Sequence, residues 1–117
     1  MVGRTNAMAG GKQWKFATGQ ISDTYASTAK TFTVSGLEFK PRIVVASFGS
    51  GANPGGEMSV GMLDDNDSVV FAGYASTSEA KYGSGSGSGH SGFTPNDSGF
   101  SMNAIPKGIF YWRAWGY

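Results

Sequence analysis

The residues that could do nucleophilic chemistry meet at one place in the sequence, where the only histidine, His90, precedes Ser91. A serine and a histidine catalyse acyl transfer only where a rigid scaffold holds the base and a third group orients it. This pair lies in residues 83–92, GSGSGSGHSG, whose composition predicts a flexible loop. The segment also matches G-x-G-x-x-G, but a dinucleotide site requires that motif between a strand and a helix, and no helical pattern flanks it. The sequence therefore predicts no catalytic role for His90.

Acidic side chains gather at residues 64–67, DDND, where a calcium site could be sought. An EF-hand loop that began at Asp65 would need an oxygen ligand at Val69 and glycine at Val70, and has neither. Asp and Asn also close tight turns, so the cluster predicts a turn. The single histidine supplies at most one metal ligand per chain, where closed zinc sites use about four. We therefore expect no metal and no cofactor.

The remaining carboxylates, the overall charge and the hydropathy pattern argue against three further classes of function. Nothing in the sequence places two carboxylates across a cleft at the separation of about 5–10 Å that glycoside hydrolysis needs, so the protein is predicted not to be an enzyme. The net charge is +1 and the basic residues are scattered, which gives no footprint for nucleic acid. No apolar run approaches the roughly 20 residues of a membrane helix, and no signal peptide is visible at Met1. We expect no nucleic-acid partner and no membrane insertion.

Aromatic residues exceed the needs of one small core, with three Trp, five Tyr and eight Phe. Four of them are assigned to the core: Trp14, Phe32, Phe39 and Phe100. Residues 109–117 form a predicted strand that is aromatic on both faces. The face with Phe110, Trp112 and Ala114 is expected to point into the core. The opposite face is expected to form an oligomer interface or to contact a ligand: Tyr111, Arg113, Trp115 and Tyr117.

The pattern of residues 31–48, TFTVSGLEFKPRIVVASF, sets the predicted architecture. Phe32 and Val34 alternate with polar residues, which predicts a strand with one buried face. Pro41 suits the start of a strand, and the run 43–46 is apolar on both faces, which predicts a strand covered on both sides. With 19 Gly and only 15% charged residues, the composition argues against helices. The sequence therefore predicts an all-β fold, a small antiparallel β-sandwich of about seven or eight strands.

Domain boundaries follow from the same patterns. Residues 1–12 lack periodicity and are expected to be a flexible lead-in or the remnant of a longer chain, whereas residues 13–117 form one domain. Further elements are expected in this order: a short strand at 14–17, a loop at 18–30, a hairpin of 58–62 and 68–74, a short strand near 79–82, a loop over 83–98 and a strand at 99–102.

Three motifs resemble one known family. Residues 32–41, FTVSGLEFKP, followed by the apolar run, resemble the V-x-G-L-x-F-K-P opening of small β-sandwich domains at the ends of bacteriophage tail fibres and related tail proteins. Residues 99–102, GFSM, resemble their late G-F strand, and residues 112–116, WRAWG, resemble their closing strand. The resemblance covers about residues 14–117. It implies a homotrimeric receptor-binding tip in the virion tail, made in the host cytoplasm and joined through residues 1–12 to the remainder of the tail fibre.

A tip of this kind attaches to a host surface polysaccharide or protein. Loops carry recognition when a rigid scaffold presents them, and the longest predicted loop covers residues 82–98. Its candidate ligand-binding residues offer stacking rings and hydrogen-bonding groups: Tyr82, His90, Phe93, Asn96 and Asp97. Two alternatives remain open from the sequence. One is a structural trimerisation or virion decoration domain without a host ligand, and the other is a carbohydrate-binding module.

Overall fold

The computed structural model describes residues 13–23, 30–49, 58–75, 80–82, 92–104 and 108–117. These residues form an all-β fold with no helix among them, in agreement with the composition. The described strands are β1 (Lys15–Ser22), β2 (Lys30–Val34), β3 (Pro41–Gly49), β4 (Met58–Leu63), β5 (Val69–Ala75), β6 (Ala80–Tyr82), β7 (Phe93–Asn96), β8 (Gly99–Ala104) and β9 (Ile109–Gly116).

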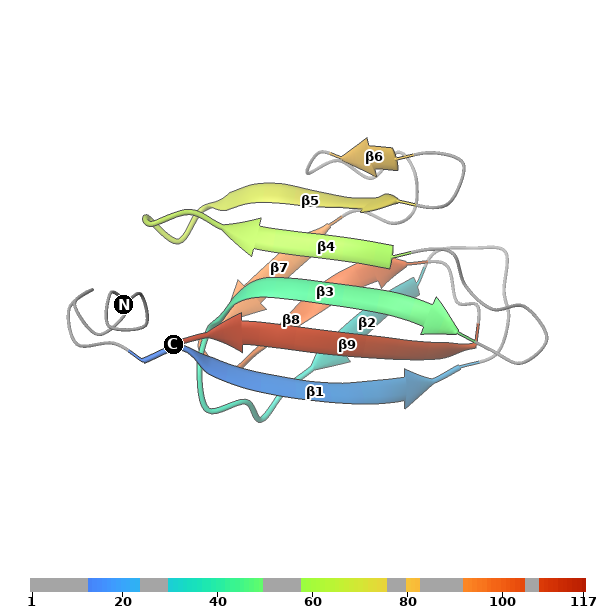
Figure 1. Ribbon diagram of the computed structural model, residues 1–117, viewed down its shortest axis with the longest axis horizontal. Coiled ribbons are helices and arrows are strands. Elements are labelled where there is room, and N and C mark those ends of the chain that lie inside the picture. The colour runs from blue at the N-terminus through green and yellow to red at the C-terminus, as the bar shows by residue number, and fades with distance from the viewer. Residues whose placement is uncertain (1–12, 24–29, 50–57, 76–79, 83–91, 105–107) are drawn as a thin grey trace, which may run out of the picture.

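The strands form two antiparallel sheets that pack face to face (Figure 1). The large sheet has the order β1-β9-β3-β4-β5-β6, and the small sheet has the order β2-β8-β7. In Figure 1 the small sheet lies behind the large one, and its strands cross those of the large sheet at an angle. This is the predicted small β-sandwich. The small sheet covers one face of the large sheet; the opposite face, called the outer face below, has no covering sheet in the described part of the chain.

The core lies between the sheets. It is built from the residues that point inward, which alternate along each strand with residues that point outward. Phe100 and Met102 of β8 point inward as predicted, and so do Phe110 and Trp112 of β9. Phe32 of β2 stacks on Phe110 with ring centroids 4.4 Å apart and planes 8° from parallel. Each buried aromatic side chain removes about 150–250 Å² from water. Burial of these rings is therefore the main force that holds the two sheets together.

Two glycines let large rings lie directly on the large sheet. A Cβ added at Gly19 of β1 would come within 2.6 Å of the Trp112 ring, and one at Gly61 of β4 within 2.2 Å of the Phe93 ring. Cβ atoms do not approach ring atoms so closely, so both positions exclude any larger side chain without rearrangement. Glycine therefore stands at inward positions of β1 and β4 where simple alternation would place an apolar side chain.

The segment between β2 and β3 carries the chain from the small sheet to the large one. Gly36 has φ +81°, in the region that favours glycine, and the Leu37 N–H donates to the Ser98 carbonyl at 2.8 Å. As predicted, β3 begins at Pro41. The register with β9 shifts between Pro41 and Ile43, which marks a β-bulge. Beyond the bulge, Ile43 faces outward.

Several assignments made from the sequence are wrong, and three of them concern the extent of strands or the core. β1 runs to Ser22, through residues predicted to be loop. Trp14 lies outside the core, with 43% of its surface exposed. The segment 93–98 is not a continuous loop, because β7 pairs with β8 along Phe93–Asn96 and adds a strand to the predicted number. In each case the local composition gave the wrong prediction, because pairing with a neighbouring strand determines where a strand runs and which of its residues are buried.

The run 43–46 is covered on one side only, in contrast to the prediction. Val44 and Ala46 are buried under the small sheet. Ile43 and Val45 are half-buried on the outer face. On β3, Val44 and Ala46 therefore belong to the core, and Ile43 and Val45 belong to a partly exposed apolar surface.

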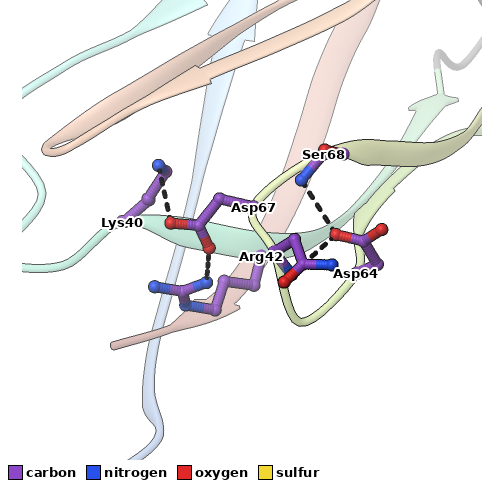
Figure 2. A network of polar contacts seen from close by, with 6 residues as sticks. Lys40, Arg42, Asp64, Asp67 and Ser68 are labelled. Carbon is purple, nitrogen blue, oxygen red and sulfur yellow. Dashed lines mark hydrogen bonds and ion pairs between the residues drawn. The ribbon is translucent and has the colours of Figure 1, made fainter.

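The acidic cluster closes the hairpin between β4 and β5, as predicted. The Asp64 Oδ1 accepts hydrogen bonds from the backbone N–H of Asn66 at 2.8 Å and of Ser68 at 2.9 Å (Figure 2). Asp67 has φ 63°, a conformation that Asp and Asn adopt more readily than most residues. Asp64 thus acts as the acceptor that shapes the turn.

Candidate functional site

The outer face of the large sheet carries apolar side chains in register across neighbouring strands. Phe16 of β1 pairs with Trp115 of β9, and Trp115 pairs with Ile43 of β3. Ile43 in turn pairs with Met62 of β4, and Met62 with Phe71 of β5. Cross-strand partners share a face of the sheet. The pairs therefore make one continuous apolar row from β1 to β5.

An open hollow of about 450 Å³ lies on this face at the end of the sheet where β9 finishes. Its lining is apolar and consists of Trp14, Ile43, Val45 and Trp115. Trp14, which precedes β1, packs edge-on against Tyr117 with ring centroids 5.0 Å apart and planes at 86°. Trp115 leans against Phe16 at 5.3 Å. These ring contacts fix the two indoles that border the hollow.

Polar residues of β9 and β1 follow the hollow on the same face, in the next rows of the register. Arg113 pairs in register with Thr18 on one side and with Val45, which lines the hollow, on the other. Its side chain is exposed, and within the described residues it has no hydrogen-bond or ion-pair partner. The next row brings Gln20 beside Tyr111. The face thus combines a flat aromatic surface with a cation, an amide and a phenol, a set that can stack on a ring and bind its polar substituents.

A charged cluster of Lys40, Arg42 and Asp67 lies beside Tyr117, and Figure 2 shows the three charged side chains. The Asp67 carboxylate accepts a hydrogen bond from Arg42 Nη1 and lies 3.3 Å from Lys40 Nζ. The hydrogen bond from Arg42 holds the pKa of Asp67 below its usual value; desolvation opposes this shift and Lys40 adds to it. The guanidinium carbon of Arg42 lies 3.9 Å from the centroid of the Tyr117 ring, a cation–π contact. The cluster therefore ties the β4–β5 turn to the end of β9.

The residues predicted for an oligomer interface lie together. Tyr111, Arg113 and Trp115 alternate along the outer face of β9. Tyr117 follows the end of that strand and contacts both Trp14 and Arg42, as described above. Nothing in the single chain tests whether a second subunit covers them, so the interface stays a prediction.

Phe93, predicted to be a ligand-stacking ring, is a core residue, and this prediction is wrong. Its side chain is 5% exposed. It packs on Gly61 and lies 6.3 Å from the ring of Phe100, centroid to centroid. A ring enclosed in this way has no face to offer a sugar.

The other residues predicted for ligand binding are not assembled into a site in the described structure. The Asn96 Oδ1 accepts a hydrogen bond from the Ser98 N–H at 2.9 Å, which closes the turn between β7 and β8. Asp97 is exposed in that turn, on the small sheet. The side chain of Tyr82, in β6, and the whole of His90 lie outside the described residues.

Sequence reasoning identified Trp115 but missed the other three residues that line the hollow. Trp14 was assigned to the core, and Ile43 and Val45 to a strand covered on both sides. The signal was present, because Trp14 and Phe16 are two residues apart and so share one face of an extended segment. The neighbour that places them beside Trp115 is β9, and strand order is not encoded in local periodicity.

No group of three or more His, Cys, Asp or Glu side chains that could hold a metal ion occurs among the described residues. The same ranges contain no helix long and apolar enough to cross a membrane.

Comparisons of the chain with protein-family models, with curated proteins and with solved structures gave no match. Fold and site together define a small β-sandwich with an aromatic outer face.

Proposed function

We propose that this chain is a non-enzymatic receptor-binding tip domain of a phage tail fibre, which attaches the virion to a glycan or protein of the host surface. The observation that carries the proposal is the aromatic hollow between Trp14 and Trp115. Trp14 and its neighbour Phe16 are 43% and 54% exposed. Contiguous exposed apolar patches mark interaction sites. The resemblance of residues 32–41 to tail-fibre tips supplies the biological setting.

The outer face suits a glycan because it pairs flat rings with planar polar groups. A Trp side chain has only two rotatable bonds, so it offers a large contact area at a low cost in conformational entropy. Gln20, Tyr111 and Arg113 supply donors and acceptors for hydroxyl groups beside the hollow. Gln20, Tyr111 and Arg113 all stand on strands, which hold recognition groups more rigidly than loops do.

A homotrimer would strengthen such binding. An open face makes weak individual contacts, and three copies that engage a repeating polymer gain avidity. The interface predicted from the sequence shares Trp115 with the hollow, so the same residue cannot serve both partners at once. We therefore place the subunit contact on the β4 side of the outer face, where Met58, Val60 and Met62 alternate outward and carry no charge.

Adhesion of the labelled domain to a panel of bacterial cells tests the proposal. Trp115→Ala should reduce adhesion about tenfold or more, as expected for an aromatic anchor, without changing the mass measured by light scattering. Val70→Ala is the control, because Val70 is an exposed apolar residue of β5 that does not line the hollow. Failure of the wild-type domain to adhere to any cell in the panel would contradict the proposal.

A structural trimerisation domain without a host ligand is the second candidate, and the apolar row from Phe16 to Phe71 favours it. A row of this length can bury a large part of a sheet face between subunits. In that case Trp115→Ala should dissociate the oligomer in light scattering, and neither form should adhere to cells. The same pair of measurements therefore separates the two candidates.

A further inference from the structure

Arg113 is placed where a bound molecule in the hollow would meet it. Its register partner Val45 lines the hollow, and Trp115, two residues further along β9, lines it from the same face. On its other side Arg113 pairs with Thr18, whose hydroxyl donates to the Trp112 carbonyl at 2.8 Å and so keeps lone pairs for a second contact. Arg113 therefore stands on the outer face directly beside a residue that lines the hollow.

The distribution of charge over the strands of both sheets distinguishes Arg113. None of the nine described strands contains Asp or Glu, and their charged residues are all basic: Lys15, Lys30, Arg42, Lys81 and Arg113. The acidic side chains in the described ranges lie between strands, where Asp23 pairs with Lys30 and Asp67 with Arg42. Arg113 has no such counter-ion among the described residues. Its charge therefore has no opposite charge near it among the described residues of the outer face.

This imbalance discriminates between possible occupants. A second copy of the same face would bring another Arg113 and no carboxylate from its described strands, and burial of an unpaired charge is strongly destabilising. A neutral ring would stack on the indoles but would leave the guanidinium without a partner. A ring that carries a carboxylate satisfies both parts of the site, because arginine binds carboxylates through two parallel hydrogen bonds.

We propose that the hollow between Trp14 and Trp115 binds an acidic sugar, whose ring stacks on the indole surface and whose carboxylate pairs with Arg113. This inference rests on the proposed function, since it names the class of glycan that the outer face would recognise. Gln20 and Tyr111 lie in the next register row, where they can bind hydroxyl groups of an adjoining sugar. The acidic polymer then runs along β9, across successive rows of the sheet.

Calorimetric titration of the intact chain with matched sugars tests the inference. The probes are oligomers of galacturonic acid, of glucuronic acid and of sialic acid, each with its methyl ester, which keeps the ring and removes the charge. At least one acid should bind the wild-type protein about tenfold more tightly than its ester. Arg113→Gln should remove that difference, and Arg113→Lys should restore part of it, since lysine keeps the charge but lacks the fork. Binding of the acid should weaken with added salt in the wild type and not in Arg113→Gln.

Lys15→Gln is the matched charge control. Lys15 is a basic residue of β1, but its register partner is Gly116, which is buried, and its Nζ lies 3.5 Å from the Glu38 carbonyl. Removal of this charge should leave the preference for the acid unchanged. A thermal melt of each variant should stay close to that of the wild type, because both side chains are exposed.

Three results of the binding measurements would overturn the acidic-sugar inference. One is equal affinity for acid and ester, the second is unchanged acid binding in Arg113→Gln, and the third is absence of binding to every acid while the domain still adheres to cells. Each of these leaves the proposed receptor-binding function standing. Loss of the proposed function has a different signature, which is a wild-type domain that adheres to no cell. An oligomer that dissociates in Arg113→Gln would also overturn the inference, since it would assign Arg113 to a subunit contact.

Discussion

Phe93 of the small sheet lies directly on Gly61 of the large sheet, so closely that a Cβ at Gly61 would come within 2.2 Å of the ring. The pair joins β7 to β4 across the core. It explains why a ring that follows a Gly-Ser segment in the sequence is buried: the partner strand offers backbone instead of a side chain. The contact makes Phe93 a structural residue, whose ring is not open to a ligand.

The first prediction concerns this contact. Gly61→Ala should destabilise the domain by about 1–3 kcal/mol, the usual cost of overpacking a core, because the added methyl group meets the Phe93 ring and cannot be accommodated without movement of β7. Chemical denaturation measures the free energy of unfolding. Gly36→Ala is the contrasting variant: nothing lies within 4 Å of its added Cβ, but φ is +81°, so it should lose only about 1 kcal/mol through backbone strain. A Gly61→Ala variant as stable as the wild type would show that the rings do not pack as described.

The sequence correctly predicted the parts of the fold in which the residue pattern of a single strand shows which of its residues are buried. Alternation in β8 and β9 correctly placed Phe100, Met102 and Phe110 inward, because burial under a second sheet repeats every two residues. The turn chemistry of residues 64–67 likewise predicted the β4–β5 hairpin.

The parts that failed depend on what lies across the sheet. β1 was predicted too short, because Gly19 faces inward and gives no apolar signal, although Trp112 fills the space above it. Val45 was expected under a second layer, but the order β9-β3-β4 and the bulge after Pro41 place it on the outer face. The candidate site was half predicted for the same reason: β9 identified Trp115 and Arg113, and the neighbouring strands that complete the hollow could not be chosen from local patterns.

The second prediction separates the two faces of β3. Val44 is fully buried, and Val45 lines the open hollow. Val44→Asp should cost several kcal/mol and can prevent folding, because it buries a charge without a partner. Val45→Asp should be far milder, since its carboxylate reaches solvent beside Arg113. Melting temperatures of the two variants check this, and equal losses would contradict the assigned faces.

The third prediction follows from the lowered pKa of Asp67. A carboxyl whose pKa is lower in the folded than in the unfolded state contributes stability above the unfolded value, about 4, and loses it as the pH falls through the folded value. Thermal melts of the wild type and of Asp67→Asn, compared between pH 7 and pH 2, should therefore converge at acidic pH. Asparagine is a suitable replacement because it also tolerates φ 63°. The carboxylate is solvent-accessible, so the difference should be small and should shrink with added salt. A gap that is constant across this range would show that the contacts of Asp67 with Arg42 and Lys40 do not stabilise the fold.

The last prediction compares two tryptophans that the sequence presents alike. Trp112 is 8% exposed and lies over Gly19, with the Phe100 ring edge-on at 5.8 Å, so Trp112→Ala should cost about 3–5 kcal/mol and reduce adhesion only through loss of folded protein. Trp14 is 43% exposed and packs edge-on against Tyr117, so Trp14→Ala should lose only about 1 kcal/mol. If the hollow is the recognition site, Trp14→Ala should nevertheless reduce adhesion to cells per folded molecule, because it removes one wall of that hollow. Circular dichroism gives the folded fraction, and adhesion is then compared at equal folded concentration. Full adhesion of folded Trp14→Ala would place the binding site away from the outer face at β9.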